Sequence, residues 1–321
     1  VLSPFLTVAG APDITLVLDQ RAFNIFSQID NRGSRYLGQI QANAGVRFNN
    51  LLGLYEGINI QGASAPDGWP DRELDYVGIN WQQPLNHEGT RLTLGGSITA
   101  TQPGYTLEQF DVEGLARSLT AEVYHPFIRS RMASMEKVLN TEVSKGLDIL
   151  GASDKGDAGL SRAAGDPQFF KATAEISRLQ RLNNTFDIFG SVAGQKSANN
   201  LLASEEFGVG GVSYGSAYDS SEITGEDGLA ARAELRINDP VVTPLQQLQV
   251  YGFYDVGRVW DRDNTVVRNR IRSLSSSGAG LRFTVNENIS GNFEVAVPLT
   301  RDVETAGDTD PRAFGGLTAR F

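Results

Sequence analysis

The sequence has 321 residues, of which 38 are acidic and 28 are basic, and its formal net charge is −10 at pH 7. This charge argues against nucleic acid as the main partner, because phosphate backbones bind basic surfaces. No run of about 18 apolar residues occurs, so the sequence predicts no membrane-spanning helix. Cysteine is absent, which is compatible with an oxidising, extracytoplasmic compartment.

The chain starts with Val1-Leu2-Ser3-Pro4 and shows no export signal, so we expect a mature or trimmed product. Residues 1–13 are interpreted as the end of a linker, and residues 14–321 as one domain built of strands. The candidate strands are residues 23–30, 39–49, 54–63, 74–85, 91–101, 112–124, 142–150, 169–179, 186–194, 229–237, 248–260, 277–285, 289–299 and 313–321. A glycine-rich loop at about 199–227 precedes the last five of these strands, and no long helix is predicted.

Two of the later strands show the clearest alternation of apolar and polar residues. In 229–237 and in 289–299 every odd position is apolar or glycine, whereas the even positions carry Arg232, Glu234, Arg236 and Glu294. Successive side chains of a strand point to opposite faces, so one face is apolar and the other is charged. This pattern suits a wall with lipid on one side and water on the other.

Strand and loop lengths distinguish two all-β architectures. A soluble β-sandwich also alternates, but its strands average about five or six residues. Most of the strands predicted here are longer, and a tilted membrane-spanning strand needs about 9–11 residues. Short polar turns alternate with long acidic loops, as in outer-membrane barrels. We therefore predict an all-β fold, a transmembrane antiparallel β-barrel with about 14 readable strands.

Four stretches, taken in order, resemble one known family. They are residues 30–38 with 49–54, a loop motif, a Phe-x-Asp-x-Gly strand and the terminal strand. The loop motif comprises Phe207, Gly208, Gly210, Gly211, Tyr214, Gly215, Ser216, Tyr218 and Asp219; the strand carries Phe253, Asp255 and Gly257; the terminal strand carries Gly316 and Phe321. Together they resemble the TpsB transporters of two-partner secretion, the haemolysin secretion/activation family of the BamA/TpsB superfamily.

The resemblance implies a sixteen-stranded barrel in the bacterial outer membrane that exports a large secreted partner, a TpsA-like exoprotein. It implies that the loop at 199–227 folds into the pore and docks on the strand of Phe253 and Asp255. It also implies that Gly316 and Phe321 belong to a signal read by the barrel-assembly machinery, and that the barrel contacts outer-membrane lipid and lipopolysaccharide.

The family's loop usually carries an Arg-Gly-aromatic sequence whose Arg reaches the inward-facing Asp, but here those positions are Ser216, Ala217 and Tyr218. Asp255 remains, and its odd register points it into the lumen. An ionised carboxylate there needs water or a cation, which Arg232, Arg236 or Arg282 can supply. The loop is then either anchored differently or mobile, and the lumen charges Arg232, Glu234, Arg236, Arg282 and Glu294 are expected to tune the channel.

Two parts of the family pattern are not found in this sequence. A hairpin of long strands is expected near residues 130–140, where residues 129–137 have an irregular, charged composition; either the hairpin is deleted or the sequence omits it. The two POTRA modules that precede the barrel in the family are also absent from this chain. They were removed or never built, or the chain is a barrel-only relative.

No enzyme chemistry is readable, and we predict no cofactor and no metal site. The two histidines, His87 and His125, fall in separate loops without a nucleophile nearby in the pattern. The acidic stretch 154–166 lacks the spacing of a calcium loop and is interpreted as solvated. An outer-membrane enzyme is thus the weakest hypothesis; the alternatives are a protein transporter, or a passive pore or structural barrel subunit of an envelope complex.

Overall fold

The protein is described by a computed structural model covering residues 2–4, 12–14, 21–65, 73–110, 114–124, 129–132, 135–148, 154–157, 160–239, 241, 244–262 and 270–321. Fifteen strands form one antiparallel sheet. They are β3 (Phe23–Asp30), β4 (Gln41–Asn49), β5 (Gly57–Ser64), β6 (Leu74–Pro84), β7 (Arg91–Thr101), β8 (Gly114–Tyr124), β9 (Arg129–Met132), β10 (Met135–Lys145), β11 (Phe170–Arg181), β12 (Phe186–Ser197), β15 (Asp227–Asn238), β16 (Gln247–Trp260), β17 (Ile271–Thr284), β18 (Ile289–Pro298) and β19 (Arg312–Arg320).

Four shorter strands form two small sheets outside this large one. β1 (Leu2–Pro4) pairs with β2 (Pro12–Ile14), and β13 (Phe207–Val209) pairs with β14 (Ile223–Gly225). Two short 3-10 helices, η2 (Tyr105–Phe110) and η3 (Ala203–Glu205), lie in loops. No helix in the described part of the chain is long and apolar enough to cross a bilayer.

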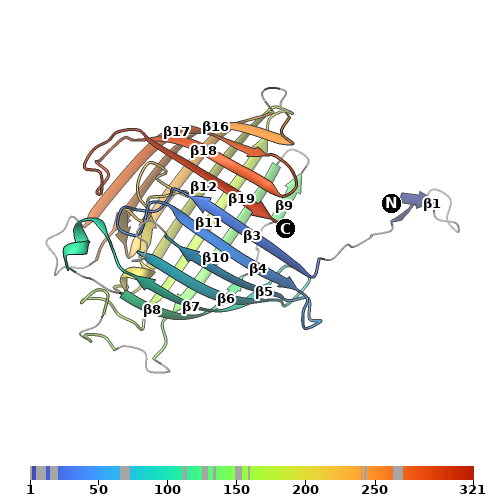
Figure 1. Ribbon diagram of the computed structural model, residues 1–321. Coiled ribbons are helices and arrows are strands. Elements are labelled where there is room, and N and C mark those ends of the chain that lie inside the picture. Colours follow the sequence, from blue (N-terminus) through green and yellow to red (C-terminus); the bar gives the residue numbers. More distant parts are fainter. Residues whose placement is uncertain are drawn as a thin grey trace.

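The large sheet curls into a barrel because its first strand pairs with its last (Figure 1). The ladder between β19 and β3 runs from Gly316 opposite Asp30 to Arg320 opposite Phe26. The two remaining edges of the sheet are β8 and β9, which no ladder joins within the described residues, although β10 lies close to β8. The prediction of an antiparallel β-barrel is confirmed.

Burial follows the predicted alternation most clearly in β16. Tyr251, Phe253, Asp255 and Val259 are buried inside, whereas Tyr254 and Val256 on the opposite face are exposed. The exposed outer face of many strands is similarly apolar, which suits contact with lipid. Asp255 therefore lies on the inner side of the barrel wall.

The two ends of the barrel differ in their connections. The short turns at 50–56, 85–90, 182–185 and 285–288 lie at one end, together with Phe321. The long loops at 198–226 and 299–311 lie at the other (Figure 1). In outer-membrane barrels the short turns face the periplasm, so the long loops mark the extracellular end.

The strand prediction was wrong around residues 129–150. The stretch 129–137, interpreted as irregular, contains β9 and the start of β10, and β10 ends at Lys145. Charged residues such as Arg131, Glu136 and Lys137 hide the alternation of apolar and polar side chains. The backbone hydrogen bonds of a strand do not depend on that alternation. The described sheet thus has fifteen strands rather than about fourteen, and the extra one, β9, is only four residues long.

Candidate functional site: a loop docked inside the barrel

The connection between β12 and β15, residues 198–226, folds into the barrel. Its turn uses glycines in the left-handed region, with φ of 131° at Gly210, 87° at Gly211 and 91° at Gly215. A side chain at Gly210 would meet the carbonyl oxygen of Asp219, so the tight turn requires glycine there. The structure places this connection at 198–226, where the sequence predicts a loop at about 199–227.

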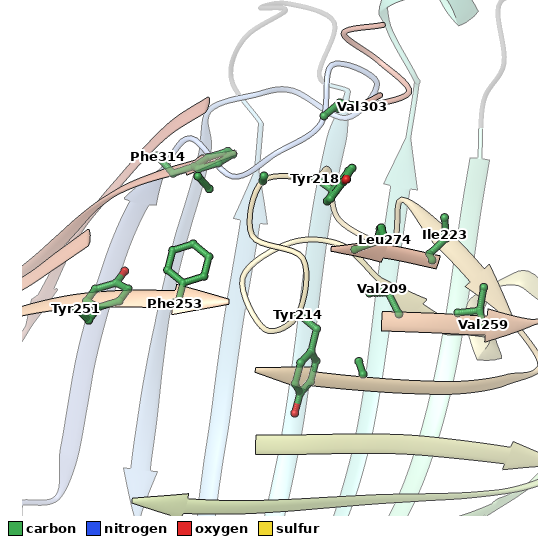
Figure 2. Close-up of a cluster of buried hydrophobic side chains, with 13 residues drawn as sticks. Val209, Tyr214, Tyr218, Ile223, Tyr251, Phe253, Val259, Leu274, Val303 and Phe314 are labelled. Carbon is green, nitrogen blue, oxygen red and sulfur yellow. The ribbon is translucent and has the colours of Figure 1, made fainter. Parts of the chain in front are cut away.

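The loop brings its own apolar side chains into the lumen. Val209, Tyr218 and Ile223 are buried against the barrel wall, as Figure 2 shows. The wall residues of this cluster are Ala230, Tyr251, Phe253, Val259, Leu274, Ala296 and Phe314, with Val303 from the loop between β18 and β19. This is the main apolar core among the described residues, and it fixes the loop inside the extracellular half of the barrel.

Asp255 is the polar contact point at the centre of this interface. Its Oδ2 accepts the backbone N–H of Ser216 at 2.9 Å and the hydroxyl of Ser276 at 3.3 Å. The guanidinium of Arg232 donates from Nη1 to both Asp255 oxygens at 3.2 Å and to Ser216 Oγ at 2.6 Å. Arg232, Asp255 and Ser276 lie directly opposite one another on β15, β16 and β17, which is why they meet.

The structure therefore decides how the loop is anchored although its tip has no arginine. Of the three cations predicted for Asp255, Arg232 is the partner. Arg236 and Arg282 bind Glu234 instead, at 2.7 Å and 3.0 Å. Arg232 also pairs with Glu234 at 2.7 Å, and its guanidinium lies 4.3 Å from the ring centroid of Phe253.

Glu294 on β18 joins the same network to the other side of the barrel. It accepts the Tyr251 hydroxyl at 2.7 Å and pairs with Arg32 at 2.7 Å, just beyond the end of β3. Arg32 also donates to the carbonyl of Ser216 at 2.9 Å and lies 3.9 Å from the ring centroid of Phe314. All five predicted lumen charges thus lie inside the barrel in one connected network.

Two further arginines hold the loop, and no pattern in the sequence predicts this role for them. Arg312, at the start of β19, donates to the carbonyl of Ala217 at 3.0 Å and pairs with Asp219 at 2.7 Å. Arg162, from the loop between β10 and β11, pairs with Glu226 at 2.6 Å and with Glu206 at 2.7 Å. Burial raises the pKa of Glu206, while the Arg162 pair opposes this shift. Arg32 lies within the stretch 30–38 that resembles the family, but that resemblance does not predict its contact with the loop.

The other predicted residues fall in three places. Phe207 and Gly208 form β13, and Gly257 of β16 faces Val209 so closely that a side chain there would collide with it. Gly316 lies in the ladder that closes the barrel, and Phe321 exchanges two backbone hydrogen bonds of 2.8 Å with Ile25. Their role in assembly stays a prediction.

The structure describes one of the two histidines, His87. His87 is exposed on a short turn, and His125 lies outside the described residues. Among the residues that the structure describes, no three His, Asp or Glu side chains gather as metal ligands.

The chain is similar to a protein family and to solved structures. The family model for haemolysin secretion/activation protein ShlB/FhaC/HecB matches residues 13–137 and 132–283. The heme/hemopexin transporter protein HuxB of Haemophilus influenzae (strain 86-028NP) is 21% identical, with an alignment covering 95% of this chain and 61% of HuxB. The chain thus spans about three fifths of the length of this curated relative.

Among solved structures, CdiB from Escherichia coli is 20% identical with a TM-score of 0.68, covering 100% of this chain and 67% of CdiB. CdiB from Acinetobacter baumannii is 14% identical with a TM-score of 0.60, covering 94% of this chain and 60% of that one. BamA from Haemophilus ducreyi lacking POTRA domains 1–3 is 12% identical with a TM-score of 0.57, covering 100% of this chain and 74% of that one. These likenesses support the barrel fold.

Proposed function

The chain belongs to the haemolysin secretion/activation family and is an outer-membrane β-barrel, and on this premise we propose that it exports a large secreted partner protein in two-partner secretion. The observation that supports this most strongly is the loop at 198–226, which lies inside the extracellular half of the barrel and is held there by polar contacts. A lumen closed by a releasable segment suits a channel that opens only for its cargo.

The docking contacts suit release as well as closure. The contacts of Ser216 with Asp255 and Arg32 are hydrogen bonds, and each such bond contributes only about 0.5–1.5 kcal/mol net, or about 1.5–3 kcal/mol when one partner is charged. A polypeptide in the lumen offers replacement donors and acceptors, so the loop can leave without stranding buried polar groups. The partner crosses unfolded from the periplasm, and its folding outside makes export irreversible.

A passive pore suits the structure less well. An open pore needs a water-filled path, but Ala217 and Tyr218 at the loop tip are almost wholly buried inside the barrel. The family is one of secretion proteins, and in the described residues His87 has no catalytic neighbour. The secreted exoprotein, lipopolysaccharide and the barrel-assembly machinery are partners proposed from the family.

The test is the secreted protein content of the native bacterium with and without the gene. The account predicts that one large protein disappears from the medium and cell surface in the deletion strain, accumulates or is degraded in the periplasm, and returns when the gene is supplied. An unchanged set of secreted proteins, together with altered permeability to small solutes, would instead support the passive pore.

A further inference from the structure

A cavity of about 830 Å³ lies inside the barrel at the short-turn end, away from the docked loop. Its wall is formed by β3 to β8 and β19, the strands drawn in blue to teal and in red in Figure 1. Four arginines line it: Arg21 before β3, Arg47 on β4, Arg91 on β7 and Arg320 on β19. By the position of the short turns, this cavity faces the periplasm.

These four arginines have no acidic partner among the described residues. Arg47 donates to the side-chain oxygens of Asn49 at 3.2 Å and Gln82 at 3.3 Å, and the Arg91 guanidinium lies 4.1 Å from the ring centroid of Tyr124. No ion pair is formed by any of the four. Two acids, Glu122 and Glu287, line the same cavity, so its side chains carry a formal excess of two positive charges.

The opposite wall of the lumen is different. On β15 to β18, the guanidiniums of Arg232, Arg236 and Arg282 are all bound to Glu234. Free cations are therefore concentrated on one wall and at one end of a chain whose net charge is −10. Among the described residues no acidic side chain neutralises these four arginines, so their positive charge can bind a ligand.

Between the arginines runs a continuous row of amide and hydroxyl side chains. Cross-strand pairing places Arg47 opposite Asn59, Asn59 opposite Asn80, and Thr93 opposite both Gln82 and Glu122. Asn80 and Gln82 are neighbours on the same face of β6, so the row continues from β4 to β8. Amides and hydroxyls both donate and accept hydrogen bonds, which matches the needs of an extended polypeptide backbone.

We propose that this wall, the arginine-amide row of Arg47, Asn59, Gln82, Arg91 and Thr93, binds extended segments of the exported polypeptide through their carboxylate side chains. The proposal rests on the proposed export function and names the chemistry of the cargo segment that the periplasmic end receives. Guanidinium groups bind carboxylates through paired N–H donors. Because the arginines are solvated, each pair is weak, so a chain can bind and still move on.

The first test is the binding of fluorescent peptides to the purified, detergent-solubilised protein. Peptides in which glutamate, lysine or glutamine alternates with serine are compared by fluorescence anisotropy. The glutamate peptide should bind most tightly, and Arg47→Gln with Arg91→Gln should weaken it about tenfold, as expected for two exposed ion pairs. Equal binding of the glutamate and lysine peptides, or no effect of the double substitution, would overturn the proposal.

A matched control separates local binding from net charge. Arg178→Gln removes a charge at the same end of the barrel, but Arg178 shares the outer face of β11 with the exposed Ile176 and, among the described residues, its side chain bonds Gln180. It should leave peptide binding unchanged, and Arg47→Lys with Arg91→Lys should retain most of it. If inorganic phosphate displaces the glutamate peptide at concentrations where sodium chloride of equal ionic strength does not, the site binds phosphate-type anions, and the peptide assignment is wrong.

The second test locates the bound peptide. Because the chain has no cysteine, Asn59→Cys places a single thiol on the arginine-amide row, whereas Gln247→Cys places one on the opposite wall. With a mild thiol oxidant such as oxidised glutathione added to accept the two electrons, a cysteine-containing glutamate peptide should form a disulfide at residue 59 several times faster than at residue 247. Equal rates would contradict the proposal. Neither test requires a secreted partner, so failure of the export function would leave these binding results standing, and failure here would leave the deletion-strain result standing.

Discussion

Arg232 and Asp255 lie directly opposite each other in the β15–β16 ladder, and Arg232 links Asp255 to the hydroxyl of Ser216 in the docked loop. The cation that fixes the loop thus comes from the barrel wall, while the loop contributes a serine. This arrangement removes the need for an arginine at the loop tip. The loop's position depends on contacts that substitution can remove one at a time.

Replacing Asp255 should loosen the loop. Asp255→Ala leaves the buried N–H of Ser216 without an acceptor, at a cost of about 1–3 kcal/mol to the docked state. Asp255→Asn keeps an acceptor oxygen and should have a smaller effect. Limited proteolysis of the loop and single-channel conductance should both increase in the order wild type, Asn, Ala; the exposed Asp302→Ala is the control. Unchanged cleavage and conductance in Asp255→Ala would remove this residue's docking role.

Replacing Arg32 should loosen the same loop from the other side. Arg32→Gln loses the ion pair with Glu294 and the contact with the Ser216 carbonyl, but the β3–β19 ladder uses only backbone atoms. The variant should therefore assemble normally, as judged by heat-modifiable migration, while its loop is cleaved several-fold faster, as expected for a charge-assisted bond. Arg117→Gln, which removes an exposed charge on β8, should resemble wild type; equal cleavage of both variants would contradict the role of Arg32.

Acidic pH should favour the docked loop. Burial raises the pKa of Glu222, which accepts the backbone N–H of Glu304 and lies near Asp219. A carboxyl whose pKa is raised in the docked state is protonated there more readily than in the released state. Docking is therefore strengthened as pH falls through the raised pKa towards the ordinary value of 4.5, and it is weakest at neutral pH.

Channel recordings test this sign. Opening events of the wild type should become rarer as the pH is lowered from neutral to about 5. Glu222→Gln mimics the neutral group and should open less often at neutral pH and depend less on pH. More frequent opening in acid, or an unchanged pH dependence in the variant, would mean that Glu222 does not control docking.

The terminal residue can be tested for its ring and its backbone separately. Phe321 is exposed, and its backbone forms two hydrogen bonds with Ile25 at the closure of the barrel. Phe321→Ala removes the ring alone, whereas deletion of Phe321 removes both. If the ring is an assembly signal, both changes should lower the amount of heat-modifiable barrel in the outer membrane; normal assembly of Phe321→Ala would refute a role for the ring.

Sequence reasoning was most successful where the two faces of a strand differ. The even positions of β15 and the odd positions of β16 could be assigned to the lumen because apolar residues occupy the alternate positions. The choice of Arg232 over Arg236 as the partner of Asp255 could not be made, because it depends on the register between two strands. That register is set by the turn that joins them and by packing, not by alternation within either strand.

Contacts with the docked loop could not be predicted from the alternation of residues along the strands. Arg162 reaches Glu226 from a loop that has no periodic pattern, and Arg312 reaches Asp219 in the docked loop from the start of β19. The strand β9 and the start of β10 were not predicted for the opposite reason: their ladder is regular, but the charged residues within them conceal it.

The most direct test of the account locks the loop in place. A Cβ placed on Gly257 would lie 3.2 Å from the Cβ of Val209, close to the spacing of a disulfide. Val209→Cys with Gly257→Cys, in a chain without other cysteines, should join the loop to the wall on oxidation. Export of the partner protein should stop under oxidising conditions and resume with reductant, while the single Val209→Cys variant, which cannot form the bridge, stays active under both conditions. Export at the wild-type rate through a fully oxidised barrel would contradict the claim that the partner crosses where the loop now lies.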